Sequence, residues 1–85
     1  MYQVSILREA LKELKSLPKQ IVVRISGAIE GLAIEPRPPG CTKLKGSTDL
    51  WRVRVGDYRI IYRIEDTIRI VEVRKVGHRR DVYDH

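Results

Sequence analysis

Four arginines on two predicted strands are the residues best suited to chemistry. They alternate with apolar residues in the segment LWRVRVGDYRIIYRI, which covers positions 50–64. Successive side chains of a strand point to opposite faces, so the arginines share one face of the sheet. Guanidinium groups bind phosphate oxygens in a fork geometry, and several on one face suit a phosphodiester. The four are Arg52, Arg54, Arg59 and Arg63.

Gly56 and Asp57 predict the turn between these strands, because a two-residue loop that begins with glycine suits a type II′ hairpin. In that register Arg54 lies directly opposite Arg59. Opposed Cβ atoms are about 4.5 to 5.5 Å apart, and like charges there destabilise a sheet. Such a conflict is expected at functional sites, although a strand face with solvated arginines is the alternative. The other face would be core, made of Trp51, Val53, Val55, Tyr58, Ile60, Tyr62 and Ile64.

The charge of the chain is concentrated around this hairpin. The sequence holds 17 Lys and Arg against 11 Asp and Glu, a formal net charge of +6. Lys43 and Lys45 precede the hairpin, either as solvated loop residues or as side chains that steer RNA. A basic stripe favours a polyanionic partner, and nucleic acid ranks ahead of a membrane because no basic amphipathic helix accompanies the stripe.

The single cysteine, Cys41, excludes an intramolecular disulfide and a cysteine-based zinc site, which fits a reducing cytosol. No apolar run is long enough to span a bilayer, and the start of the chain lacks the pattern of a signal peptide. We therefore expect a soluble cytoplasmic protein with no membrane partner.

The first half of the chain predicts one strand and two helices. Residues 2–6 have strand character and are expected at an edge or paired with the C-terminal half. Apolar residues at helical spacing predict a helix from Leu7 to Leu17, and Pro18 suits the first turn of a second helix that reaches Leu32. We therefore expect one α+β domain over residues 1–85, with an N-terminal strand and a two-helix hairpin packed on one face of a small antiparallel sheet.

A further strand of the sheet is predicted over residues 67–75. Glu65 and Asp66 would form the two-residue turn before this strand. That turn sets a register in which Glu72 lies opposite Arg59. The two side chains could then form a cross-strand ion pair, which is worth about 0 to 1 kcal/mol.

Beyond this strand, Gly77 would turn the chain so that His78, Arg79 and Tyr83 approach the arginine face. A lone histidine is usually a surface residue, but beside a phosphate an imidazole can act as general acid or base, because its pKa lies near operating pH.

The arginine hairpin, the segment VRKVGHRRDVY at 73–83 and the helical hairpin with a Leu-Pro break together resemble the RelE/ParE superfamily of toxins, the RelE branch in particular. The resemblance covers nearly the whole chain. It implies a ribosome-dependent endoribonuclease that cleaves mRNA in the ribosomal A site by attack of the ribose 2′-hydroxyl on the adjacent phosphate, without a metal or other cofactor. The implied partners are a cognate antitoxin, the ribosome and mRNA.

The resemblance also implies residue roles. Arg59 would stabilise the phosphate, Arg79 would act as acid or second electrostatic donor, and Tyr83 would stack on or orient a base. A guanidinium is a poor general base, so that role stays open between Arg54, His78 and His85. The implied catalytic residues are Arg54, Arg59, Arg79 and Tyr83. The implied RNA contacts are Arg52, Arg63, Lys43, Lys45, His78 and Arg80.

Two other functions compete with the nuclease. Toxins of the ParE branch share this fold and inhibit DNA gyrase by binding it, without cutting RNA. The arginine and tyrosine constellation favours the nuclease over this alternative. A plain RNA-binding module fits less well, because Trp51, Tyr58 and Tyr62 project to the core side and leave few aromatic rings to stack on bases.

Overall fold

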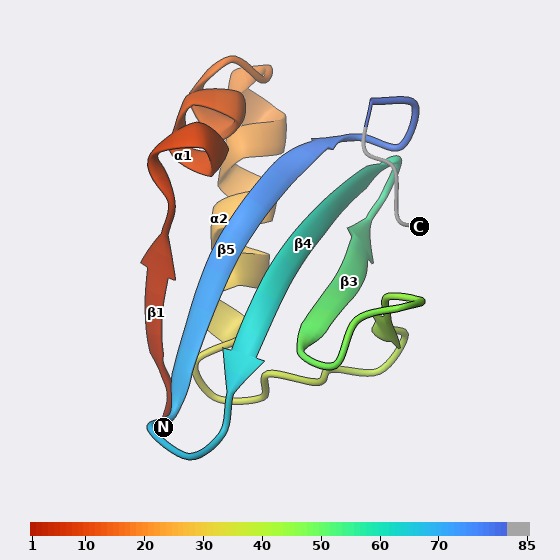
Figure 1. Cartoon of the computed structure of the whole chain (residues 1–85). Coiled ribbons are helices and arrows are strands. Elements are labelled where there is room, and N and C mark those ends of the chain that lie inside the picture. Colours follow the sequence, from red (N-terminus) through yellow and green to blue (C-terminus); the bar gives the residue numbers. More distant parts are fainter. Residues whose placement is uncertain (82–85) are drawn as a thin grey trace.

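The computed structural model describes residues 1–81 and shows two helices packed against one face of a five-stranded sheet (Figure 1). The strands lie in the order β1-β5-β4-β3-β2. This arrangement confirms the predicted α+β class and the placement of the helical hairpin on one face. In chain order the elements are β1 (Gln3–Ile6), α1 (Arg8–Lys15), α2 (Lys19–Gly31), β2 (Thr42–Lys43), β3 (Leu50–Val55), β4 (Tyr58–Glu65) and β5 (Ile70–His78).

The sheet is mixed, which corrects the prediction of a purely antiparallel one. β1 pairs in parallel with β5, with Val4 opposite Val71, while the other pairs are antiparallel. Parallel neighbours need a long crossover connection, and here both helices and three strands lie between the two partners in the chain. The prediction that the first strand pairs with the C-terminal half at an edge is confirmed.

The helices form where their apolar stripes predict. Pro18 directly precedes α2, and its carbonyl accepts hydrogen bonds from the N–H groups of Ile21 and Val22. Within the described part of the chain, neither helix is long and apolar enough to cross a membrane. The two helices bury one side chain per turn against the sheet, at Ala10, Leu14, Ile25 and Ile29.

The core lies between the helices and the predicted apolar face of the hairpin, which is confirmed. Ile60 and Tyr62 are completely buried, and Trp51 packs against the same cluster. The phenol of Tyr62 donates a 2.8 Å hydrogen bond to the carbonyl of Pro36, so the ring ties the loop after α2 to the centre of the sheet. Burial raises the pKa of this phenol above its usual range.

The register between β4 and β5 differs from the prediction. The two strands are joined by a four-residue turn over residues 66–69, in which Arg69 has a φ of 54°. The longer turn places Glu72 opposite Arg63, and Gly77 lies opposite Arg59. The predicted ion pair between Glu72 and Arg59 is therefore wrong. A further register shift between Ile61 and Tyr62 bends the strand pair.

The edge of β5 continues past the end of β1 and is closed by a helix side chain. Glu13 of α1 accepts hydrogen bonds from the backbone N–H of Val76 at 3.0 Å and from Nζ of Lys75 at 3.1 Å. The carboxylate thus supplies the acceptor that a longer β1 would otherwise provide, and it fixes the strand that leads to the end of the sheet.

Candidate functional site

The β3–β4 hairpin forms as the sequence predicts. Val55 lies opposite Tyr58, and Arg54 lies opposite Arg59. Gly56 has a φ of 61°, the left-handed conformation that the first position of a type II′ turn requires. We call residues 52–59 together with residues 77–81 the hairpin end of the sheet, because β5 ends beside this turn.

Three arginines of the hairpin end influence one another. Burial, and then repulsion from Arg59 and Arg54, lowers the pKa of the Arg52 guanidinium. The Nε atoms of Arg52 and Arg59 are buried, whereas the Arg54 side chain is exposed. The sheet therefore holds three like charges close together, two of them partly desolvated. An anion bound among them would relieve the repulsion and favour the charged form of each group.

The segment after β5 adds Arg79 to this end of the sheet. The backbone N–H of Arg79 donates a 2.8 Å hydrogen bond to the carbonyl of Asp57, which holds the segment against the hairpin turn (Figure 1). The side chains of Arg79 and Arg80 are exposed. The structure thus brings Arg79 to the same end of the sheet as Arg54 and Arg59, while Tyr83 and His85 lie outside the described residues.

His78 does not join the arginine face. It lies opposite Tyr58, and the two rings make an edge-to-face contact with centroids 5.4 Å apart. Directly opposed residues share a face, so His78 lies on the core side with Tyr58. Its Nδ1 accepts a hydrogen bond from the backbone N–H of Arg80 at 3.2 Å. The prediction that Gly77 turns His78 towards the arginines is therefore wrong.

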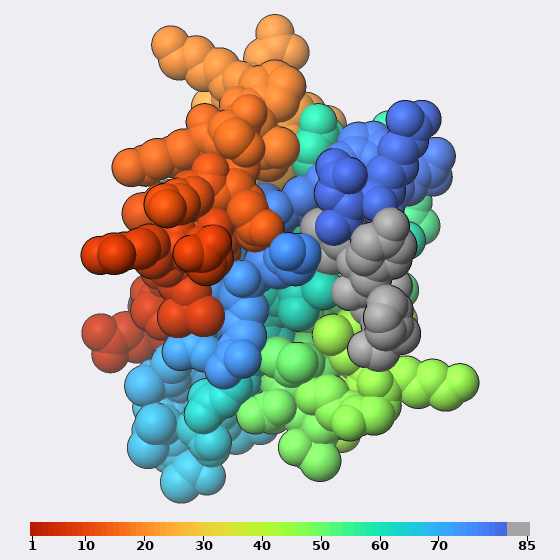
Figure 2. Space-filling view, turned by 45° about the horizontal axis from the view of Figure 1, so that its top comes forward, coloured from red at the N-terminus to blue at the C-terminus, as the bar shows by residue number. Residues whose placement is uncertain are grey.

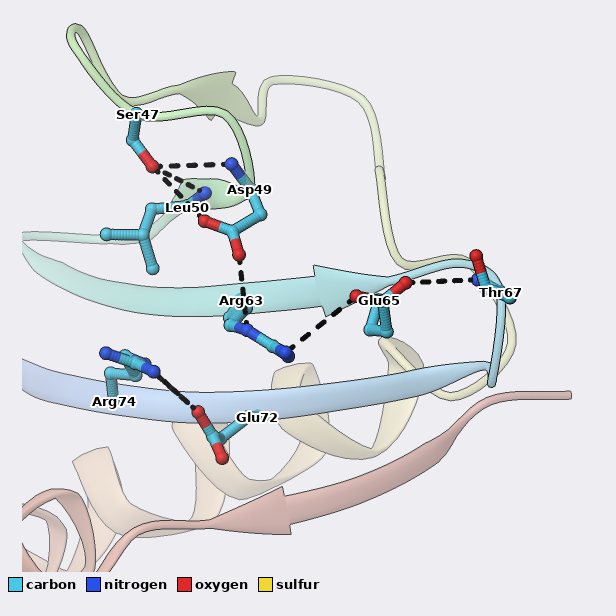
Figure 3. Close-up of polar contacts among 8 residues, drawn as sticks. All are labelled: Ser47, Asp49, Leu50, Arg63, Glu65, Thr67, Glu72 and Arg74. Atoms are coloured by element: carbon cyan, nitrogen blue, oxygen red, sulfur yellow. Dashed lines mark hydrogen bonds and ion pairs between the residues drawn. The ribbon is translucent and has the colours of Figure 1, made fainter.

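Arg63 shares the arginine face but has acidic neighbours. Its guanidinium pairs with Asp49 at 3.2 Å and with Glu65 at 3.8 Å (Figure 3). The hydroxyl of Ser47 accepts hydrogen bonds from the backbone N–H groups of Asp49 and Leu50, which orders the chain that carries the first carboxylate. The charge of Arg63 is thus neutralised within the protein, and a contact from Arg63 to RNA stays a prediction.

The segment with the two candidate lysines folds over the sheet. Leu44 is buried with Ile61 and packs against Leu50, a second small cluster on the arginine face that the sequence did not reveal. Lys43 lies opposite Trp51 in β2, so it shares the core-side face, and Lys45 is exposed in the turn that follows. Lys43 therefore faces away from the arginine side of the sheet, and a contact from either lysine to RNA stays a prediction.

A second polar cluster occupies the other end of the sheet. Asp66 accepts two hydrogen bonds from the Arg37 guanidinium, at 2.8 and 3.2 Å, and one from the Tyr2 hydroxyl at 2.5 Å. Arg37 also lies 4.8 Å from the centre of the Trp51 ring. These hydrogen bonds lower the pKa of Asp66 to about 2. We call this region, with Arg63 and its acidic partners, the loop end.

Comparison with known proteins identifies similar chains. Residues 4–83 match the profile of a family described as the ParE toxin of the type II toxin–antitoxin system parDE. The chain is 31% identical to the toxin RelG of Mycobacterium tuberculosis, over 96% of this chain and 95% of RelG. It is 35% identical to the toxin RelE3 of Methanocaldococcus jannaschii, over 88% of each chain.

Solved structures agree with the sequence relatives. The archaeal RelE–RelB complex of Pyrococcus horikoshii contains a chain that superposes with a TM-score of 0.82 at 34% identity, over 95% of this chain and 98% of that one. The isolated RelE toxin of Escherichia coli superposes with a TM-score of 0.80 at 25% identity, over 92% of this chain and 84% of that one.

Proposed function

Because the chain belongs to the RelE/ParE family of toxins from type II toxin–antitoxin systems, we propose that it cleaves mRNA on the ribosome and is neutralised by a cognate antitoxin. The named relatives support the RelE type of action, and the similar chains solved in RelE–RelB complexes support an antitoxin partner. The observation that carries the proposal is the convergence of Arg52, Arg54 and Arg59 on one face of the hairpin.

The proposed reaction needs positive charge more than any other group. The ribose 2′-oxygen attacks the adjacent phosphorus, the bond to the 5′-oxygen breaks, and a cyclic phosphate and a 5′-hydroxyl result. Charge develops on the phosphorane oxygens, where preorganised donors stabilise it. We assign this task to Arg59, and we assign protonation or electrostatic stabilisation of the leaving 5′-oxygen to Arg79, which the turn holds at the same end of the sheet.

The 2′-proton needs an acceptor, and the three candidates differ in position. Arg54 is on the face of Arg59, His78 is on the opposite face, and His85 lies outside the described residues. A guanidinium is a weak base, so we propose that placement of the 2′-hydroxyl by the ribosome supplies much of the rate. Positioning alone contributes about 7 to 11 kcal/mol to a reaction barrier. No metal takes part in this proposed mechanism.

Gyrase poisoning is the second candidate function, and the ParE description of the matching family profile favours it. Under that function the chain would bind gyrase, and the arginine face would have no chemical role. The two candidates therefore predict different damage in cells and different consequences for loss of a hairpin arginine.

The decisive experiment is to induce the chain in bacteria and map the 5′ ends of messages. New ends within translated frames, absent on induction of Arg59→Ala, are the expected result. Intact messages with broken DNA would overturn the nuclease and leave gyrase poisoning. Purified protein should cut ribosome-bound message and leave naked RNA almost intact, so efficient cutting of free RNA would contradict the proposed dependence on the ribosome.

A further inference from the structure

Arg24 of α2 lies against the tip of the arginine hairpin, although it is distant from the hairpin in sequence. Arg24, Ala28 and Gly31 are spaced by four and three residues, which places them on one helix face. The last two line a cavity of about 260 Å³ together with Val53, Arg54 and Val55 of β3. One turn earlier in the helix, Arg24 continues this face as far as Gly56.

The turn fits the guanidinium closely. A Cβ atom built on Gly56 would lie 3.3 Å from Nη2 and 3.5 Å from Nη1 of Arg24, so the missing side chain leaves the room that the guanidinium occupies. In the same turn, the carbonyl of Asp57 accepts a hydrogen bond from the backbone N–H of Arg79. The turn is therefore flanked by Arg24 from the helix side and by Arg79 from the segment after β5.

The surface around the turn is exposed and rich in positive charge. Figure 2 shows the tip of the hairpin reaching the surface between the helices and the segment after β5. Arg24, Arg54 and Arg79 are exposed, and among residues 1–81 none of them forms an ion pair with an acidic side chain. The acids nearby are Asp57 in the turn, Glu35 at the cavity and Asp81, two residues after Arg79. We call Arg24, Arg54 and Arg79 the tip arginines.

We propose that Arg24 binds a backbone phosphate of RNA that passes over the hairpin tip, beyond the phosphate that we assign to Arg59. The inference rests on the proposed nuclease function and extends its surface from the sheet to α2. Contacts of this kind position the nucleic acid without reading its sequence. Arg24 would thus fix the path of the strand and would not touch the reacting atoms.

The test is binding of a single-stranded RNA whose 2′-oxygens are methylated, so that it cannot be cut. Affinity is measured by fluorescence anisotropy over a range of salt concentrations, for wild type, Arg24→Gln and Arg8→Gln. Arg8 starts α1, which lies at the opposite edge of the sheet from the hairpin, so it is a charge-matched control (Figure 1). Each phosphate contact contributes about 0.7 to the slope of log affinity against log salt for a single strand.

Arg24→Gln is expected to flatten that slope by about 0.7 and to weaken binding equally for unrelated sequences. Arg24→Lys should retain the slope, and Arg8→Gln should match wild type. A wild-type slope in Arg24→Gln would overturn the inference alone, because wild-type binding would still support an RNA substrate. Loss of antitoxin binding without a change in slope would assign Arg24 to a protein interface. A wild-type chain without salt-dependent RNA binding would overturn the inference about Arg24, whereas the proposed function is overturned only by the absence of cuts in ribosome-bound message.

Discussion

The two ends of the sheet use the same residue type in opposite ways. At the loop end, Arg37 is held by Asp66 and by the Trp51 ring, and Arg63 is held by two carboxylates. At the hairpin end, Arg54 directly opposes another arginine. The arginines at the loop end are thus structural residues paired with acids. Arg54 at the hairpin end faces a second arginine and is a candidate for anion binding.

The difference follows from what each end has to join. The cluster around Asp66 connects the first residues of the chain, the loop after α2 and the turn between β4 and β5, so its ion pairs hold three segments together. The hairpin end is connected by a two-residue turn and needs no such bridge. The repulsion of Arg52 by Arg54 and Arg59 is a local cost that a bound phosphate would offset.

The largest expected effect is on stability at the loop end. Tyr62→Ala removes a fully buried ring and its hydrogen bond to Pro36, and should lower the free energy of unfolding by about 3 to 5 kcal/mol. Urea denaturation measures the change. Tyr62→Phe keeps the ring and should cost about 0.5 to 1.5 kcal/mol. Equal losses in the two variants would show that the hydrogen bond, and not packing, anchors the loop.

The next effect is on activity at the hairpin end. Arg59→Ala should reduce cleavage of ribosome-bound message by about a hundredfold to a thousandfold, the usual loss for one preorganised donor to a developing oxyanion. Its melting temperature should stay close to wild type, because the change also removes the repulsion with Arg54. Antitoxin binding serves as the control for folding. Undiminished growth arrest by this variant would favour gyrase poisoning over RNA cleavage as the function.

Sequence reasoning succeeded where a local rule fixes the geometry. The glycine-led turn sets the hairpin register, and strict alternation then assigns every residue of β3 and β4 to a face. The helices followed from apolar spacing and from Pro18. These signals lie within about a dozen residues, so no knowledge of the rest of the fold was needed to find the facing arginines.

The rest depends on packing between distant segments. The turn before β5 uses Arg69 in a left-handed conformation that non-glycine residues rarely adopt, so its length could not be predicted, and the misplacement of His78 followed from that register. The contact of Arg24 with Gly56 requires the docked position of α2. Likewise the partners of Asp66 come from residues 2 and 37, which no periodic pattern connects to it.

The loop-end cluster also predicts a response to acid. The folded-state pKa of Asp66 is about 2, below the ordinary value for aspartate of about 3.9, so this carboxylate stabilises the fold above pH 4 or so and loses that contribution as the pH falls towards 2. Asp66→Asn should reduce the dependence of stability on pH in this window. Thermal melts from neutral to acidic pH measure it, with Asp57→Asn at the hairpin turn as the control. Identical acid profiles for wild type and Asp66→Asn would mean that the cluster does not stabilise the fold.

The smallest effects should differ in sign between the two ends. Arg63→Ala removes ion pairs with Asp49 and Glu65 on a half-buried side chain and should cost up to about 1 kcal/mol, less at high salt because screening weakens the pairs. Arg54→Ala removes only a repulsive neighbour of Arg59 and should leave stability unchanged or slightly raised. Urea denaturation of both variants at low and high salt makes the comparison. Equal destabilisation by the two substitutions at low salt would show that Arg54 has a structural partner. The two ends of the sheet would then not differ in this respect, and the assignment of Arg54 to the anion site would lose its physical basis.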